Sequence, residues 1–313
     1  MKTYCLLTAV LCLSMILMPL VFIAEGKTDN QLKNNISAAE QISVLQSISG
    51  RVVETDMKQY IIGAVAAEMP ASYSAEALKA QAVACYSYAK WLRENADNPK
   101  TDENYDISDN SSVHQGYLTD EQMKEKWGDK YESYKEKIDS AVSAVLGECL
   151  MYEGEPIMAA FHAISPGRTL SSQAVWGEAL PYLQSVNAPG DTLSPDYDSV
   201  AEFTSQELIK LCSLKDTAGN LIKNITADDN GYVTKITVGE KSYSGNEFYS
   251  LLKLKSPVFT AEYKEDKYVF SVIGYGHGVG MSQYSADYMA RQGYAYDEIL
   301  KHFYKNAYID KVI

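Results

Sequence analysis

Apolar residues recur at helical spacing in the segment DMKQYIIGAVAAEM. Asp56 is a suitable N-cap, and Pro70 pushes the residue before it out of helical geometry, so we predict a helix between them. Ile61, Val65 and Glu68 fall on one face of this helix by the i, i+4, i+7 rule. Glu68 is therefore expected to point inward, at a position where the pattern calls for a hydrophobic side chain.

Similar patterns predict the rest of the fold. The predicted elements are a helix from after Ser74 to about Arg93, an amphipathic helix from about Asp120 to Leu146, a hairpin turning at Glu153-Gly154 whose return strand delivers His162, a loop-rich stretch from Leu180 to about Pro195, paired strands in VTKITVGEKSYSG followed by a helix from Gly245 to Leu252, strands around KYVFSVIGYGHGVGM, and helices at 282–292 and 296–304. Strands and helices are mixed without regular alternation. The expected fold class is α+β, with a mixed sheet and helices.

The N-terminal segment predicts a membrane anchor. Residues 3–24 carry no charge and are long enough to cross a bilayer as a helix. A cleavable signal peptide is the alternative, but the best cleavage point, after Ala24, places Phe22 where a small residue is needed. We expect an uncleaved single-pass transmembrane helix at 1–25, a polar linker at 26–41 and an extracytoplasmic catalytic domain at 42–313, divisible into two subdomains with a cleft between them.

Composition narrows the function classes. The formal net charge is −13, and no Lys/Arg stripe is interleaved with aromatic residues, which argues against nucleic acid or an anionic lipid surface as partner. The 24 tyrosines, against three tryptophans and seven phenylalanines, suit half-exposed surfaces that stack on sugars, although amphipathic strands explain them equally well. Cys85, Cys149 and Cys212 lack a C-x-x-C pair, so a disulfide framework and a thiolate zinc cluster are not expected.

Glu68 has the properties of a general acid. A carboxyl that faces an apolar interior has a raised pKa, because burial disfavours its ionised form. Such a group can hold a proton until it meets a leaving-group oxygen, as cleavage of a glycosidic bond requires. The structural alternative is a glutamate at a helix end that caps a neighbouring backbone group or pairs with Lys79.

The segment IGYGHGVGMSQ alternates glycine with larger residues. As an extended strand it would present the side chains of Tyr275 and His277 on one face and bare backbone on the other, against which a ligand could lie. A tightly packed, twisted strand with a merely hydrogen-bonded His277 is the alternative. The spacing matches neither a phosphate loop nor a dinucleotide-binding loop.

The segment FHAISPGRT brings His162, Ser165 and Arg168 close in sequence. A serine near a histidine suggests an acyl-transfer nucleophile, but the G-x-S-x-G motif is missing and Ser-Pro-Gly is typical of a turn. The histidines are scattered and H-E-x-x-H is absent, so a zinc site would need distant segments. His114 is the candidate ligand there, with a surface histidine as the alternative.

Three segments together resemble the stage II sporulation protein D family, which are peptidoglycan lytic transglycosylases of endospore-forming bacteria. The segments are VAAEMPASYSAEALKAQAVACYSYA, FHAISPGRTLSSQAVWGEALPYLQSVNAPGD and GYGHGVGMSQYSADYMARQGYAYDEILKHFY. The resemblance extends from about residue 50 to the C-terminus. It also implies a protein anchored in the cell membrane, whose domain faces the wall during engulfment.

The resemblance implies a mechanism. Glu68 matches the catalytic acid/base of the family motif A-A-E-M-P and would cleave the bond between N-acetylmuramic acid and N-acetylglucosamine to a 1,6-anhydro product. The implied substrate is glycan stripped of stem peptides by a companion amidase, stage II sporulation protein P, with the membrane protein stage II sporulation protein M in the same complex. The candidate substrate-binding residues are Tyr86, His162, Ser165, Arg168, Tyr275, His277 and Gln283.

The chain also departs from the family pattern. Tyr86 stands where an arginine is usual, Ile273 replaces another arginine, and Pro166 interrupts a usual Ser-Gly-Gly. The cysteine common after the second helix is replaced near His114, which puts in doubt the zinc that some relatives carry, and no other cofactor is expected. A glycan-binding or scaffolding paralogue without turnover is therefore the second hypothesis. A serine or cysteine acyl hydrolase using Ser165 or Cys85 is the third.

Overall fold

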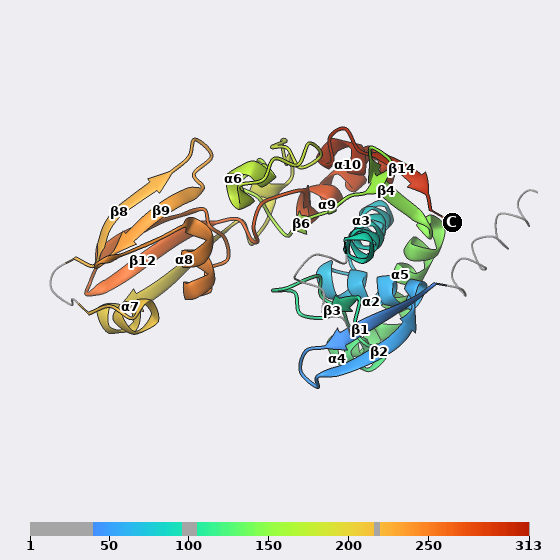
Figure 1. The fold of residues 1–313 in the computed structure, drawn as a ribbon, viewed down its shortest axis with the longest axis horizontal. Coiled ribbons are helices and arrows are strands. Elements are labelled where there is room, and N and C mark those ends of the chain that lie inside the picture. The colour runs from blue at the N-terminus through green and yellow to red at the C-terminus, as the bar shows by residue number, and fades with distance from the viewer. Residues whose placement is uncertain (1–39, 96–104, 216–219, 313) are drawn as a thin grey trace, which may run out of the picture.

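A computed structural model describes residues 40–95, 105–215 and 220–312 (Figure 1). Its buried residues form two hydrophobic clusters. The second cluster lies within residues 198–273, here called the small lobe; the other described residues form the large lobe. In Figure 1 the small lobe stands at one end of the molecule, and the chain enters and leaves it next to α6 and β6. This arrangement is α+β, as predicted.

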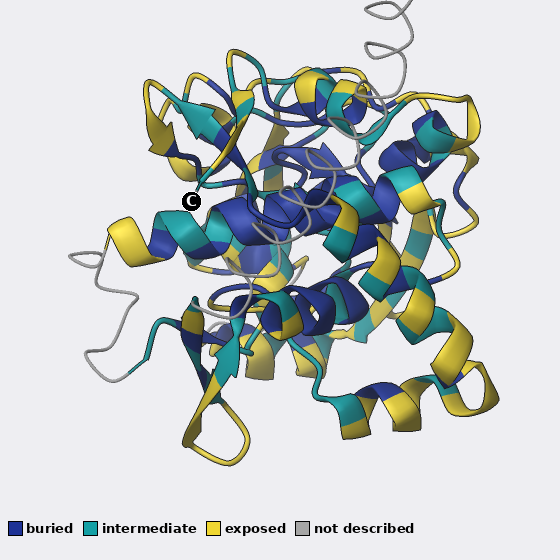
Figure 2. Ribbon diagram, turned by 90° about the vertical axis from the view of Figure 1, so that its right-hand side faces the viewer, coloured by how far each residue is buried: buried dark blue, intermediate teal, exposed yellow. Residues whose placement is uncertain are grey.

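The large lobe is built around helix α3. Its helices and strands are β1 (Gln41–Gln46), β2 (Arg51–Asp56), α2 (Met57–Glu68), α3 (Ala75–Glu94), β3 (Ile107–Ser108), α4 (Asp120–Trp127), η1 (Gly128–Lys130), α5 (Tyr131–Val145), β4 (Glu148–Tyr152), β5 (Glu155–Pro156), β6 (Phe161–His162), α6 (Ser172–Trp176), η2 (Asp191–Leu193), β13 (Met281–Ser282), α9 (Gln283–Arg291), α10 (Tyr296–Phe303) and β14 (Tyr308–Lys311). Most positions of α3 are buried, because α2, α5, α9, α10 and β4 all pack around it. Buried positions accordingly gather on the central helices of this lobe, and exposed ones on its outer turns (Figure 2).

The small lobe packs two helices against antiparallel strands. Its elements are β7 (Asp198–Thr204), α7 (Ser205–Cys212), β8 (Ile222–Ala227), β9 (Val233–Val238), β10 (Lys241–Tyr243), α8 (Gly245–Leu252), β11 (Phe259–Lys264) and β12 (Lys267–Ile273). Each helix begins with a capping box, in which Thr204 pairs with Glu207 and Ser244 with Glu247. Phe248 of α8 packs against Phe259 and Phe270 of the sheet at the centre of this core.

The helix that ends at Glu68 forms as predicted. The Asp56 side chain accepts a hydrogen bond from the N–H of Gln59 at 2.9 Å and caps α2, which stops two residues before Pro70. The predicted helix after Ser74 and the predicted helix from Gly245 to Leu252 are also present. The capping residue and the proline therefore predicted the ends of the helix that carries the candidate acid Glu68.

Several predicted elements differ in the structure. The long helix from Asp120 to Leu146 is broken at Gly128, which has φ +52° and ends α4. The hairpin does turn at Glu153-Gly154, but its return strand is only two residues long, and His162 lies instead in β6, paired parallel with β13. In place of one mixed sheet, the described strands form five small sheets, ordered β2-β1-β3, β10-β9-β8, β11-β12-β7, β13-β6 and β14-β4-β5.

The predicted anchor at 1–25 and nearly all of the predicted linker at 26–41 lie outside the described residues. Among the described residues, no helix has the length and apolar character needed to span a bilayer.

Candidate active site around Glu68

Glu68 is the last residue of α2, and its side chain is half-buried. Its Oε1 accepts a hydrogen bond from the backbone N–H of Gly116, in the segment that leads to α4. The fit is close, because a Cβ atom added to Gly116 would lie 3.0 Å from Oε1 and 3.1 Å from the Ala67 Cβ. The carboxyl is therefore held by a second segment of the chain.

Burial raises the pKa of the Glu68 carboxyl, while the Gly116 N–H and the charge of Lys126 oppose the rise. Its position at the C-terminal end of α2 also disfavours the ionised form, because the helix dipole is negative there. Tyr88 and Tyr60 lie close enough for the Glu68 charge to act on them; burial is the main cause that raises the pKa of Tyr88 to about 12. Glu68 thus combines a raised pKa with fixed geometry, as a general acid requires.

A chain of buried side chains leads from the surroundings of Glu68 to the last motif. Cys85, whose thiol feels the charge of Glu68, accepts a hydrogen bond from Gln81 Nε2 at 3.3 Å. Gln81 Oε1 accepts one from Gln283 Nε2 at 3.1 Å. Gln283 is only 5 % exposed, so its predicted contact with substrate would need a rearrangement, whereas its contact with α3 is present.

The glycine segment before β13 is not an extended strand. The φ angles are +83°, +100°, +80° and +76° at Gly274, Gly276, Gly278 and Gly280. This left-handed region favours glycine, and the positive values contradict the predicted strand with alternating faces. At Gly280 an added Cβ would collide with the carbonyl of Ala160, so close backbone packing also requires glycine there.

His162 and His277 lie side by side, with their ring centroids 5.9 Å apart. His162 Nδ1 contacts the Val279 carbonyl at 3.0 Å, which assigns the proton to Nδ1. His277 Nδ1 accepts a hydrogen bond from the Val279 N–H at 3.1 Å. Burial is the main cause that lowers the pKa of His162 to about 4 and of His277 to about 3, so both are neutral near pH 7.

Ser165 is fully buried and donates a hydrogen bond to Oδ2 of Asp191 at 2.6 Å. Asp191 is also fully buried, and its other oxygen accepts hydrogen bonds from Ser282 and Ser285 at 2.6 and 2.7 Å. These four residues, here called the Asp191 node, connect the middle motif to the start of α9. The burial of Ser165 argues against an acyl-transfer nucleophile, because its hydroxyl is closed off from solvent, and its contact with substrate stays a prediction.

Arg168 and Tyr275 remain accessible. The guanidinium of Arg168 donates hydrogen bonds to Ser185 Oγ at 2.9 Å and to Asn187 Oδ1 at 2.6 Å. The Tyr275 ring is 48 % exposed, and the Lys255 ammonium lies over it, 5.3 Å from its centroid. Both remain predictions as substrate contacts.

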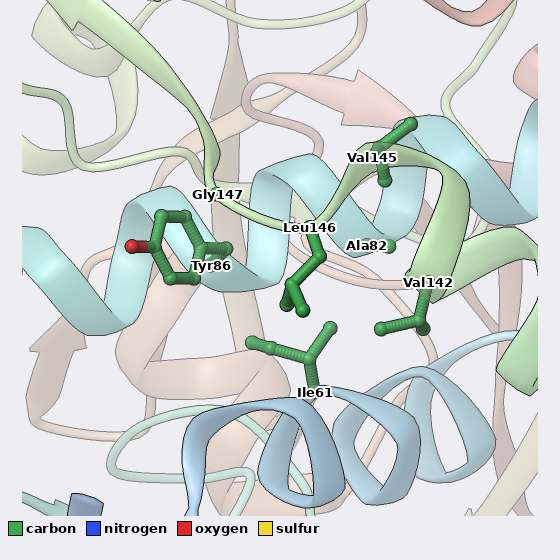
Figure 3. A pocket seen from close by; sticks show the side chains of 7 residues that line it. All are labelled: Ile61, Ala82, Tyr86, Val142, Val145, Leu146 and Gly147. Carbon is green, nitrogen blue, oxygen red and sulfur yellow. The ribbon is translucent and has the colours of Figure 1, made fainter. Parts of the chain in front are cut away.

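The structure does not bring Tyr86 to Glu68. Tyr86 points to another side of α3 than Cys85 and Tyr88, since successive residues of a helix are about 100° apart. It lines a small cavity of aliphatic side chains that includes Ile61, and its hydroxyl points away from them (Figure 3). That hydroxyl donates a hydrogen bond to Glu40 at 3.1 Å. Tyr86 therefore stabilises the start of the described chain.

His114, considered above as a metal ligand or a surface histidine, is not on the surface. It is mostly buried, and its Nδ1 accepts a hydrogen bond from the Ser108 N–H at 3.0 Å. Within residues 40–95, 105–215 and 220–312, no three His, Cys, Asp or Glu side chains come together in a group that could hold a metal ion.

Two neighbours of Glu68, Gly116 and Lys126, lie in segments whose sequence pattern does not indicate them. Gly116 follows a polar loop that shows no periodicity, so no pattern indicates it. Lys126 is on the mostly exposed helix α4, where a lysine is typical of a solvated face. Its Nζ donates a hydrogen bond to the Ala66 carbonyl of α2 at 2.9 Å. Both neighbours depend on how α4 and the segment before it pack on α2.

The family described as Stage II sporulation protein (SpoIID) matches residues 46–152. Stage II sporulation protein D of Bacillus subtilis (strain 168) is 31 % identical over 99 % of this chain and 96 % of its own length. Stage II sporulation protein D of Bacillus amyloliquefaciens is 33 % identical over 86 % of this chain and 78 % of its own.

A further relative, named Amidase enhancer, also comes from Bacillus subtilis (strain 168). It is 28 % identical over 77 % of this chain and 39 % of its own length. The similarity to the two sporulation proteins covers most of each chain. This chain therefore belongs to the stage II sporulation protein D family.

Proposed function

We propose that this chain is a lytic transglycosylase that cleaves the bond between N-acetylmuramic acid and N-acetylglucosamine in peptide-free glycan strands. One observation carries the proposal. Glu68 is a half-buried carboxyl whose pKa is raised by burial and whose position is fixed by the Gly116 N–H. Such a group can be protonated when it meets the substrate and ionised immediately afterwards.

The reaction needs only one such group. Protonated Glu68 gives its proton to the glycosidic oxygen, and the bond from that oxygen to the muramoyl anomeric carbon breaks. The carboxylate then takes the proton of the muramoyl 6-hydroxyl, whose oxygen bonds to the anomeric carbon. The products are a 1,6-anhydro-muramoyl end and a free 4-hydroxyl, and Glu68 regains its proton without a water molecule being consumed.

The proposed route differs from hydrolysis in what it requires beside Glu68. Glycoside hydrolases usually use two carboxyl groups about 5 to 9.5 Å apart. An intramolecular hydroxyl nucleophile removes the need for a second carboxyl.

The proposal extends to cellular context. We place the domain outside the cytoplasm, held by the apolar segment at 1–25 as a single-pass membrane anchor, where it acts on wall glycan during engulfment. A companion amidase, stage II sporulation protein P, would supply the peptide-free strands, with stage II sporulation protein M in the same complex. The relative named Amidase enhancer supports a functional connection to an amidase.

The second candidate is a glycan-binding or scaffolding paralogue with little or no turnover. The position of Tyr86 favours it, because the residue that replaces the expected arginine is buried and bonded to Glu40. A cation that orients substrate in the family would then have no counterpart at this position.

One assay separates the two candidates. The full chain is incubated with peptide-free glycan strands, and the products are analysed by mass. We expect 1,6-anhydro-muramoyl ends from the wild type and from the matched control Glu132→Gln, an exposed glutamate of α5. Glu68→Gln should form none. Binding of strands without any product would favour the paralogue, and equal product from Glu68→Gln would refute the proposed acid.

A further inference from the structure

Lys126 places a positive charge beside the candidate acid. Helix α4 packs against α2, and the ammonium of Lys126 donates a hydrogen bond to the Ala66 carbonyl at 2.9 Å, two residues before Glu68. Lys126 and Glu68 make no direct ion pair, yet the charge of each acts on the other. The ammonium of Lys126 and the carboxyl of Glu68 are therefore near each other but not in contact.

The ammonium group retains binding capacity. It has three N–H donors, and the Ala66 carbonyl takes one of them. Its side chain is exposed to solvent, so a ligand can reach the remaining donors. Among the described residues, Lys126 is the only cationic side chain whose charge shifts the pKa of Glu68. The chain has a formal net charge of −13, so a cation beside Glu68 gives this site a local positive charge that can attract an anionic ligand.

The chemistry of the proposed substrate supplies a matching anion. The muramoyl sugar whose anomeric carbon reacts also carries a lactyl ether on O3, on the ring carbon two bonds away from that reacting carbon. Without a stem peptide, the lactyl group ends in a free carboxylate. With a stem peptide, the same carbon belongs to a neutral amide. Charge at this position is thus the chemical difference between peptide-free and peptide-bearing glycan nearest to the scissile bond.

We propose that Lys126 binds the lactyl carboxylate of the muramoyl residue held at Glu68, and so makes this site selective for peptide-free strands. This inference rests on the function proposed above. It assigns substrate recognition to α4, outside all three sequence motifs, and gives the site a cation although Tyr86 provides none. The structural alternative is that Lys126 only caps the C-terminal end of α2 through the Ala66 carbonyl.

The test measures binding, so that it does not depend on turnover. The full chain carrying Glu68→Gln is titrated with peptide-free strands and with the same strands after conversion of their lactyl carboxylates to methylamides. We expect the free carboxylate form to bind about tenfold more tightly, as is typical of a partly exposed hydrogen-bonded ion pair. Addition of Lys126→Gln should abolish this preference, and Lys126→Arg should retain most of it.

Lys124→Gln is the matched control. Lys124 lies on the same helix and pairs with Asp120 at 3.1 Å, so its loss changes the net charge equally without touching α2. The preference should persist in this variant. Circular dichroism of each variant checks that the fold is retained.

Three results would overturn the inference. They are an unchanged preference in Lys126→Gln, equal weakening on both strands as expected of a simple helix cap, and no binding of either strand. The proposed function fails separately. A Lys126-dependent binding preference without cleavage by the wild type would support the inference and refute the proposed transglycosylase activity. Equal cleavage of both kinds of strand would support the activity and refute the inference.

Discussion

Gln283 of α9 donates a hydrogen bond to Gln81 of α3 at 3.1 Å, across 202 positions of the chain. Both side chains are buried, and Gln81 passes the connection on to Cys85. This pair joins the segment that carries Glu68 to the segment that carries the glycines. The relative position of the two motifs therefore depends partly on this amide contact, beside others such as the hydrogen bond from the Ser74 N–H to Asp287 Oδ1 at 2.7 Å.

The glutamine pair should show energetic coupling. Gln283→Ala leaves the Gln81 oxygen buried without its donor, which costs about 1–3 kcal/mol of unfolding free energy. A double-mutant cycle with Gln81→Ala, measured by urea unfolding of the full chain, should give a coupling of about 1 kcal/mol. Strictly additive effects of the two substitutions would show that the contact contributes nothing of its own.

Gly116→Ala should impair activity more than stability. The new methyl group would lie 3.0 Å from Glu68 Oε1 and would displace the carboxyl. A displacement of about 1 Å can cost about a hundredfold in rate, so we expect a loss of that order in anhydro-product formation.

Gly50→Ala is the comparison for this substitution. Gly50 has φ +67° and open space around it, so alanine there costs backbone strain and makes no contact with Glu68. Gly50→Ala should lower the melting temperature and keep wild-type product formation. Full activity in Gly116→Ala would contradict the close fit around Glu68.

The rate should fall as pH rises through the raised pKa of Glu68, since the proposed acid must be protonated. Lys126 lowers that pKa, so Lys126→Gln should move the falling limb of the kcat/KM profile to higher pH. Lys124→Gln should leave the limb in place. The other titratable groups around Glu68, namely Tyr60, Tyr88 and Cys85, stay neutral over this range because burial raises their pKa values. A profile that stays flat would exclude Glu68 as the acid.

Glu68→Gln should stabilise the fold at alkaline pH. Because the folded pKa of Glu68 lies above its unfolded value, protonation stabilises the folded state, and this contribution is lost as pH rises through the folded pKa. Glutamine does not ionise, so the variant should melt at a higher temperature than the wild type at pH 8. At pH 4 the two proteins should melt at similar temperatures. Glu132→Gln serves as control, and a gain of equal size at both pH values would point to a cause other than ionisation.

Local sequence signals predicted the elements around Glu68 well. Asp56 and Pro70 set the ends of α2 through capping and proline geometry, which act within a few residues. Helical periodicity continues across Gly128 and gives no sign of the positive φ that breaks the helix there. The alternation of glycine with larger residues at 274–280 resembles strand patterning, but φ is positive at each of these glycines, so the segment is not a strand.

Contacts between distant segments could not be predicted in this way. Gly116 and Lys126 reach Glu68 only because the segment before α4, and α4 itself, pack on α2. The burial of Ser165 depends on Asp191, which is 26 positions away, and on two serines of the last motif. Periodicity shows which face of a helix is buried, but not which segment packs against that face. Glu68 could therefore be predicted as a candidate acid from the sequence, whereas the residues around it could not.

The Asp191 node has a consequence for how relatives of this chain can diverge. Asp191 has no exposure to water, so a substitution that removes one of its serine donors leaves part of a charge unsatisfied, and a substitution of Asp191 leaves three hydroxyls without their acceptor. Homologous proteins are expected to inherit all four residues together or to exchange them as a group. Covariation among these positions would then reflect the packing of the fold, even though all three serines lie within the sequence motifs shared with the family.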